Sequence, residues 1–192
     1  MTPICITPPT LEPLSLAEAK AWLKVDSTAD DLLISALITA ARVHVEKATR
    51  LFLLTQNWNV VADNWPCQRQ WRGRIVDLPL SPVQSVASIT LYDDYDVPTI
   101  INPATYRLDK SQANPRLIFS SVPPAPQRVA QGIEIALVNG FGDAAASVPE
   151  PLRQAMRLLV AYFYLNRGDA TVPAPVSVQA LIAPFRRLKV RV

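Results

Sequence analysis

The sequence predicts an α+β fold that is mainly helical: a small helical bundle with an inserted antiparallel β-rich region and a short C-terminal tail. Apolar residues recur at helical spacing near both ends of the chain, whereas the middle alternates with a period of two. Eighteen prolines against five glycines mark stiff seams between the elements. The expected single domain divides into N-terminal helices at 1–54, the β-rich insert at 55–139, a C-terminal helix completing the bundle at 140–177, and the tail at 178–192.

The composition is that of a folded globular protein, because 49% of the 192 residues are hydrophobic and 18% are charged. Area scaling for this size predicts that about 70% of the surface is buried on folding, which is enough for one good core. The net charge of +3 leans basic only through the C-terminus, so the chain as a whole does not have the composition of a dedicated nucleic-acid binder. We expect a cytosolic product without a signal peptide, and the longest apolar run, 158–165, is too short to span a membrane.

Two helices are predicted in the N-terminal part. Ser15 and Glu18 have the spacing of a capping box, in which each side chain satisfies a free backbone N–H of the other residue, so a helix is expected over about 16–25. Asp30 and Asp31 favour the start of a second helix, which reaches about Thr49, since carboxylates stabilise the first helical turn.

The second predicted helix has a narrow polar face. This face is formed by four residues at spacings of four, three and four: Ser35, Thr39, Arg42 and Glu46. Nearly every other position before the last turn is apolar. We therefore expect the helix to be covered on most sides, either by its own fold or by a neighbouring subunit.

The central and C-terminal parts predict five or six short antiparallel strands, a long helix and a final ambiguous element. The long helix is expected to have Pro151 at its first position and to stop at Gly168. The final segment, from Ser177 onward, fits either a helical stripe or an alternating strand, and Pro184 interrupts it in both cases.

No cluster of residues predicts catalysis. His44, the only histidine, falls on the second helix at core spacing, far in sequence from Cys5 and Cys67, and no ligand spacing indicates a metal site. The sequence does not decide whether the two cysteines are paired or free. There is no G-x-S-x-G nucleophile motif. We expect a chain that is not an enzyme and that needs no cofactor or metal.

Three further features are better explained by structure than by ligand binding. Asp93, Asp94 and Asp96 lack the glycine and distal glutamate of a calcium loop, so a solvated turn is expected. The segment 139–142, NGFG, lacks the Gly-Lys-Ser/Thr of a phosphate loop, so it is expected to turn the chain out of the sheet. Exposed tryptophans around 65–71 fit interface anchoring at least as well as ligand stacking.

The order of five segments resembles the head–tail connector (adaptor) proteins of tailed bacteriophages and prophages. The resemblance covers about residues 14–188. Its segments are LSLAEAKAWLKVD, DDLLISALITAARVHVEKATR, LPLSPVQSVASITLYDD, NGFGDAAASVPEPLRQAMRLLVAYFYLNRGD and VQALIAPFRRL. No single block is diagnostic, but their order and spacing together are specific.

The resemblance implies a structural protein of a phage, prophage or phage-derived virion, made in the bacterial cytoplasm. It implies a ring of twelve copies below the portal protein, joined on its other side to a tail-side connector or stopper protein. DNA would pass through the ring without sequence-specific binding. The C-terminal tail would dock onto the portal, as helix or strand, through an apolar and basic set: Leu181, Phe185, Arg186, Arg187, Leu188, Lys189 and Arg191.

The alternative hypothesis is a nucleic-acid-binding module that uses the basic tail and exposed tryptophans. Affinity for phosphates would then fall steeply with salt. Because only four clustered basic residues support this alternative, the structural adaptor remains the leading prediction.

Overall fold

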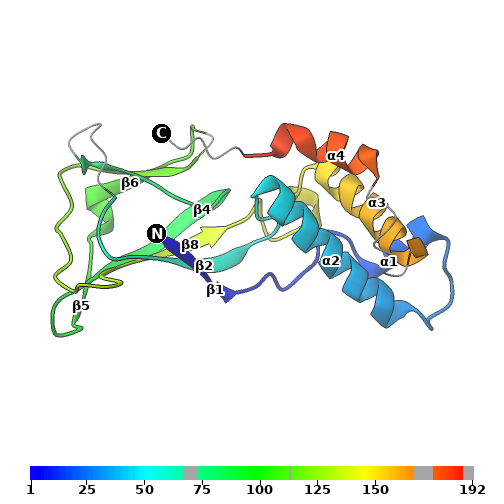
Figure 1. The fold of residues 1–192 in the computed structure, drawn as a ribbon, viewed down its shortest axis with the longest axis horizontal. Helices are drawn as coiled ribbons and strands as arrows, with labels where there is room; N and C mark the ends of the chain where they lie inside the picture. Colours follow the sequence, from blue (N-terminus) through cyan, green and yellow to red (C-terminus); the bar gives the residue numbers. More distant parts are fainter. Residues whose placement is uncertain (67–72, 113, 167–174, 188–192) are drawn as a thin grey trace. The chain divides into compact units, whose positions relative to one another are not determined.

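The computed structural model describes residues 1–66, 73–112, 114–166 and 175–187. Its contacts divide the chain into two compact units. The β unit comprises residues 1–8 and 55–140, and the helical unit comprises residues 9–54 and 141–192. Each unit is therefore built from segments that are distant in sequence, and we describe the two units separately (Figure 1).

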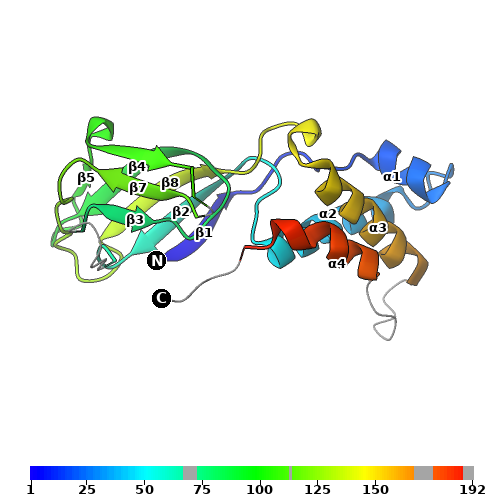
Figure 2. The same cartoon turned by 90° about the horizontal axis from the view of Figure 1, so that it is seen from above.

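The β unit contains two antiparallel sheets, which form two layers (Figures 1 and 2). The five-stranded sheet has the order β1-β2-β8-β4-β5, and the three-stranded sheet has the order β3-β7-β6. The strands are β1 (Thr2–Thr7), β2 (Gln56–Ala62), β3 (Ile75–Asp77), β4 (Val83–Tyr92), β5 (Pro98–Ile100), β6 (Tyr106–Asp109), β7 (Arg116–Phe119) and β8 (Ile133–Asn139).

Strand β8 shows why these residues form a two-layered sheet. Ile133, Ile135 and Leu137 are buried and alternate with half-buried Glu134 and Ala136, so one face of the strand enters the core. Ile135 pairs with Val60 on β2 and with Ile89 on β4, which are both fully buried. These inward rows, together with the buried Leu117 of β7, form the core of the β unit.

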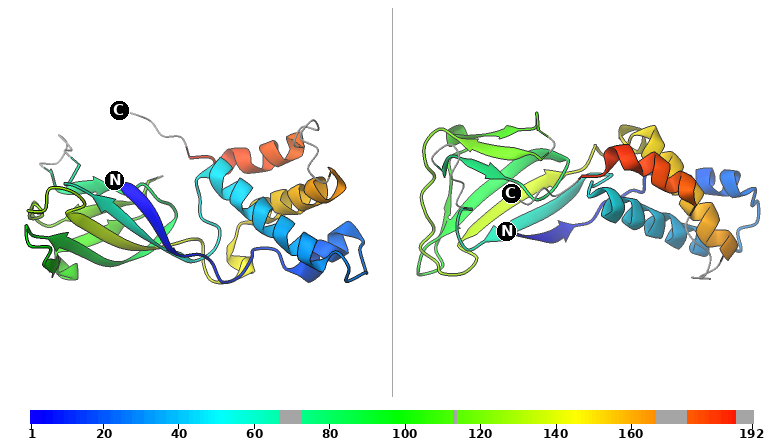
Figure 3. Two further views of the ribbon diagram at one scale, coloured as in Figure 1. Left: turned by 60° about the horizontal axis from the view of Figure 1, so that its bottom comes forward. Right: turned by 45° about the horizontal axis from the view of Figure 1, so that its top comes forward.

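The helical unit contains α1 (Leu16–Leu23), α2 (Asp31–Thr49), α3 (Glu150–Asn166) and α4 (Val176–Ile182). Helices α2, α3 and α4 lie side by side (Figure 3). Three-ten turns lie at Pro103–Thr105 in the β unit and at Ala145–Ser147 and Ala183–Phe185 in the helical unit. The core is built from buried residues of all four helices and the adjoining loops, including Ile34, Ile38, Leu152, Met156, Leu159, Val178 and Ile182.

The expectation of a mainly helical bundle with an insert is wrong. Of the described residues, 35% are helical and 26% lie in strands, and the strands form a compact unit with its own core. Part of the difference is β1, which contains Pro3 and lies in the proline-rich segment 3–13 that the sequence predicts to be only a seam. An edge strand tolerates proline because one side of its backbone has no strand partner, and β1 lies at the sheet edge. The four-part division of the chain stays a prediction.

Candidate assembly surfaces

The C-terminal segment predicted to dock is in part packed on its own helical unit. Leu181 and Phe185 are half-buried and contact the helical core. The backbone N–H of Arg187 donates to the carbonyl of Thr49 at 3.1 Å, and burial lowers the pKa of the Arg187 guanidinium. Arg186 is exposed and donates a hydrogen bond to the side chain of Gln179. Of the described members of the predicted set, Arg186 is thus the exposed one, whereas Leu181, Phe185 and Arg187 are half-buried.

The remaining members of the predicted docking set, Leu188, Lys189 and Arg191, lie outside the described residues. Helix α4 ends at Ile182, and the three-ten turn that follows it contains Pro184. Val178 and Ile182 of α4 are fully buried in the helical core. Docking of the C-terminal segment onto the portal stays a prediction.

An ion-pair network joins α1 to α3. Arg153 lies between Glu18, at 2.7 Å, and Glu150, at 3.0 Å, and Arg157 reaches the other Glu150 oxygen at 2.5 Å. The backbone N–H of Ser15 and the nearby arginines hold the pKa of Glu18 below its usual value. The hydrogen bond from Arg157 lowers the pKa of Glu150 in the same way. The charges of this network therefore serve the fold of the helical unit.

A second network fixes the loop before α1 to the polar face of α2. Arg42, which is 9% exposed, donates to Glu12 at 2.8 Å and to Glu46 at 3.0 Å. The other oxygen of Glu46 accepts the backbone N–H of Leu53 at 3.0 Å. Thr39 also donates to Glu12, at 2.9 Å. Arg42 in the polar stripe predicted for this helix is thus buried beneath the chain's own N-terminal loop, and Glu46 is bound by the segment after the helix, whereas Thr39 stays exposed.

The histidine and cysteines considered as possible reactive or metal-binding residues do not form a cluster among the described residues. His44 is half-buried and lies edge-on to Phe163, with ring centroids 6.5 Å apart. Cys5 is a free, exposed thiol on β1, and Cys67 lies outside the described residues. Within the described ranges, no group of three or more His, Cys, Asp or Glu side chains is arranged to hold a metal ion.

The acidic turn and the glycine segment have local structural roles. Asp93 accepts the backbone N–H groups of Tyr95 and Val97 at 2.9 and 2.8 Å, which shapes the turn between β4 and β5. Asp96 pairs with Arg128 at 3.1 Å. A side chain at Gly142 would collide with the Ser147 hydroxyl, so this glycine allows a close approach of two chain segments after β8.

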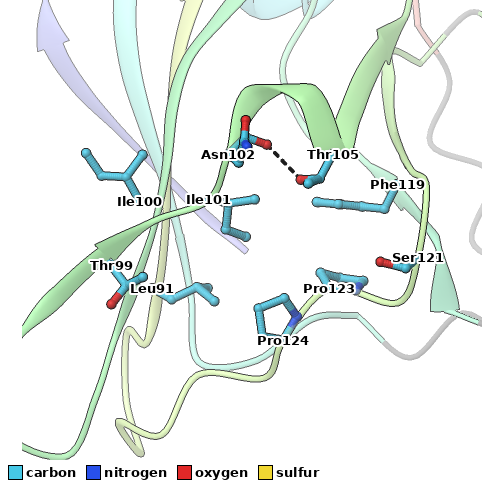
Figure 4. Close-up of a pocket in the computed structure, with 10 residues that line it drawn as sticks. All are labelled: Leu91, Thr99, Ile100, Ile101, Asn102, Thr105, Phe119, Ser121, Pro123 and Pro124. Atoms are coloured by element: carbon cyan, nitrogen blue, oxygen red, sulfur yellow. Dashed lines mark hydrogen bonds between the residues drawn. The ribbon is translucent and has the colours of Figure 1, made fainter.

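The β unit carries an apolar hollow of about 260 Å³ beside the edge strand β5 (Figure 4). Its walls include Leu91, Ile101, Phe119 and Pro124, and Ile100 on its rim is 66% exposed. Trp65 contacts two of these lining residues. Its ring packs edge-on to Phe119, with ring centroids 5.3 Å apart, and its indole N–H donates to the carbonyl of Pro124 at 2.8 Å. The hollow has few polar groups, so it suits an apolar side chain of another protein better than a charged ligand.

Trp65 is therefore half-buried and structural rather than a free stacking surface, and Trp71 lies outside the described residues. Trp22 on α1 is 44% exposed. None of the described helices is long and apolar enough to cross a lipid bilayer. Among the described residues, the apolar hollow beside β5 and exposed side chains such as Trp22 and Arg186 are the candidate surfaces for contact with other proteins.

Comparison with solved structures identifies close relatives of this fold. The chain is similar to a chain in the neck of an empty gene transfer agent particle, resolved with C6 symmetry, at a TM-score of 0.85 and 28% identity over 99% of this chain and 97% of that one. It also matches a chain of the native gene transfer agent virion and one in the native neck resolved with C12 symmetry. Their TM-scores are 0.83 and 0.77, each at 27% identity with the same coverage.

The chain has the fold of a virion neck protein. The predicted resemblance to head–tail connectors is therefore confirmed, although no protein-family model and no curated protein sequence matches this chain. The relatives match both the β unit and the helical unit, because the alignment covers 99% of the chain.

Two surfaces are not evident from the sequence: the apolar hollow beside β5 and the exposed leucines at the start of α2, Leu32 and Leu33. The hollow is built from residues far apart in sequence, so no local signal could have revealed it. Leu32 is visible in the sequence as an apolar residue, but only the packing shows that it is 89% exposed.

Proposed function

We propose that this chain is a structural head–tail connector in the neck of a phage, prophage or phage-derived particle. The similarity to the neck chains of gene transfer agent particles over nearly the full length of both proteins carries this proposal. The function is mechanical: the chain is one copy of an assembly that joins the DNA-filled head to the tail.

The finer assignment is a ring of twelve copies that contacts the portal protein on one side and a tail-side connector on the other. The C6 and C12 symmetries of the similar necks support a ring, since each is a closed rotational assembly. DNA passes through such a ring, and the chain's modest net charge of +3 fits passage better than tight phosphate binding.

The C-terminal tail is assigned to portal docking, with its basic residues meeting acidic or carbonyl groups. Arg186 is exposed and therefore accessible to a partner, whereas Leu181 and Phe185 also hold the segment on the helical core. In this assignment, the two apolar residues position the tail and the basic residues from 186 onward make the contact.

The direct test removes the gene in cells that produce the particle. We expect DNA-filled heads and separate tails, and rejoining of the two when the full chain is supplied. Particles that remain joined without the chain would overturn the proposed function.

The tail is tested by variants that leave the helical core intact. Ending the chain at Ser177 would remove the buried Val178 and Ile182, so a chain ending at Arg187 is the better truncation. That truncation, and Arg186→Glu, are expected to weaken binding to the portal protein encoded beside this gene. Arg107→Glu, which makes the same charge change at an exposed site of the β unit, serves as the control. Unchanged portal binding by both tail variants would move the contact elsewhere on the chain.

A further inference from the structure

Helix α2 carries a row of exposed apolar side chains on its outer side. Leu32 is 89% exposed and Leu33 is 39% exposed, and Ala36 and Ala40 follow them on the exposed side of the helix. Val43, one turn further, is half-buried. From residue 32 to residue 43 the helix rises about 17 Å, and none of these five positions carries a charge.

This face lies beside the polar stripe of the same helix. Arg42 and Glu46 of the stripe are bound by Glu12 and by the backbone of Leu53, whereas Ser35 and Thr39 are exposed next to the apolar row. In the left view of Figure 3, no other helix of the helical unit lies in front of α2. Helix α2 therefore exposes an uncharged row of apolar side chains beside the exposed Ser35 and Thr39, whereas the charged Arg42 and Glu46 are held by other parts of the chain.

We propose that this face, defined by Leu32, Leu33, Ala36 and Ala40, is a contact between neighbouring copies of this chain in the assembled ring. The inference rests on the proposed function. Similar chains occupy necks with C6 and C12 symmetry, so a second copy is the partner that every subunit of such an assembly must meet. The small side chains of Ala36 and Ala40 let another element of the neighbouring copy approach closely, and the leucines supply the apolar area to be buried.

The symmetry also constrains what the face contacts. A closed ring of more than two copies joins one surface of each subunit to a different surface of the next. The α2 face is therefore expected to meet a different part of the neighbouring copy. A charge-free patch suits this contact, because an unpaired charge inside a subunit interface is costly to desolvate.

The test is photo-crosslinking within assembled particles. A photoreactive amino acid replaces Leu32 in one variant and Val129, a residue of the β unit that is 91% exposed, in the control variant. Both sites are solvent-accessible, so neither substitution disturbs a core. We expect position 32 to yield a covalent dimer of this chain in isolated necks and position 129 to yield less of it. Crosslinks from position 32 to another neck protein, or none at all, would overturn the inference.

A charge variant gives an independent readout. Ala40→Glu places a carboxylate on the face while keeping a good helix former at an exposed position. We expect it to fold normally by circular dichroism and to reduce incorporation into necks at least about tenfold. Ser35→Glu, on the polar side of α2, is the matched control and should be incorporated almost normally. Normal incorporation of Ala40→Glu would contradict the proposed contact.

The proposed function and the proposed α2 contact can be refuted separately. If the wild-type chain is absent from the neck, the proposed function is wrong. If the wild-type chain is present but position 32 does not crosslink to a second copy, only the assignment of the α2 face is wrong.

Discussion

Arg153 of α3 donates a hydrogen bond from Nη2 to the Oε1 atom of Glu18 on α1 at 2.7 Å. The same guanidinium donates from Nε to the carbonyl of Pro13 at 3.1 Å. One side chain thus ties α3, α1 and the loop before α1 together, across more than 130 residues of sequence. This side chain therefore connects the two chain segments of the helical unit, residues 9–54 and 141–192.

We expect Arg153→Ala to destabilise the helical unit by about 2 kcal/mol, since it removes charge-assisted hydrogen bonds from a side chain that is only 15% exposed. Chemical denaturation followed by helical circular dichroism measures this change. Lys47→Ala, at an exposed position of α2, is the control and should change the free energy of unfolding by less than about 0.5 kcal/mol. Equal stability of the two variants would contradict the structural role of Arg153.

The stability of the helical unit should depend on acidic pH through Glu18 and Glu150. The pKa of Glu18 is lowered in the fold by the backbone N–H of Ser15, and that of Glu150 by Arg157, from the ordinary glutamate pKa of 4.5. Because the folded pKa is depressed, the stabilisation is present above pH 4.5 and is lost as pH falls through the lower folded pKa. Unfolding measured at a series of pH values should show this loss, and Glu18→Gln should flatten it. A Glu18→Gln profile identical to that of the wild type would refute the coupling.

The capping box at the start of α1 should contribute measurably to stability. The Ser15 hydroxyl accepts the backbone N–H of Glu18 at 3.2 Å, while Glu18 accepts the backbone N–H of Ser15 at 2.9 Å. Ser15→Ala is expected to cost about 1 kcal/mol. Ser35→Ala makes the same chemical change inside α2, where alanine is the better helix former, and should not destabilise the chain. Thermal unfolding of the two variants side by side checks the difference.

The β unit has its own core, which one pair of isoleucines can test. Ile135→Ala on β8 removes a fully buried side chain and should cost about 2–5 kcal/mol. Ile100→Ala on β5 makes the same change at a site that is 66% exposed and should cost less than about 1 kcal/mol. Tryptophan fluorescence reports unfolding of this unit, because Trp65 packs on Phe119 inside it. Comparable losses at the two sites would indicate a different core.

Several elements were predictable because their signals are local. The capping box of Ser15 and Glu18 is present as expected, although α1 ends at Leu23, where Lys24 adopts a left-handed backbone. The second helix was expected to reach Thr49 and does so. The resemblance to head–tail connectors followed from the order of such local elements and is confirmed.

Other features depend on packing that a sequence pattern does not contain. The mainly helical fold class was wrong because the strands form two antiparallel sheets with their own core, and β1 joins the larger sheet by pairing with residues fifty or more positions away. Because α2 is mostly apolar, the sequence predicted that the helix is covered by its own fold or by a neighbouring subunit. It did not indicate which side of the helix each would cover. Only the structure shows that Ile34 and Ile38 are buried while Leu32 is exposed.

The most direct test of the connector role is a cryo-electron microscopy reconstruction of the neck in particles produced with this chain. We expect a closed ring of copies between the head and the tail, in which each copy fits the fold of the β unit and of the helical unit. A complete neck in which no density accommodates either unit would contradict it.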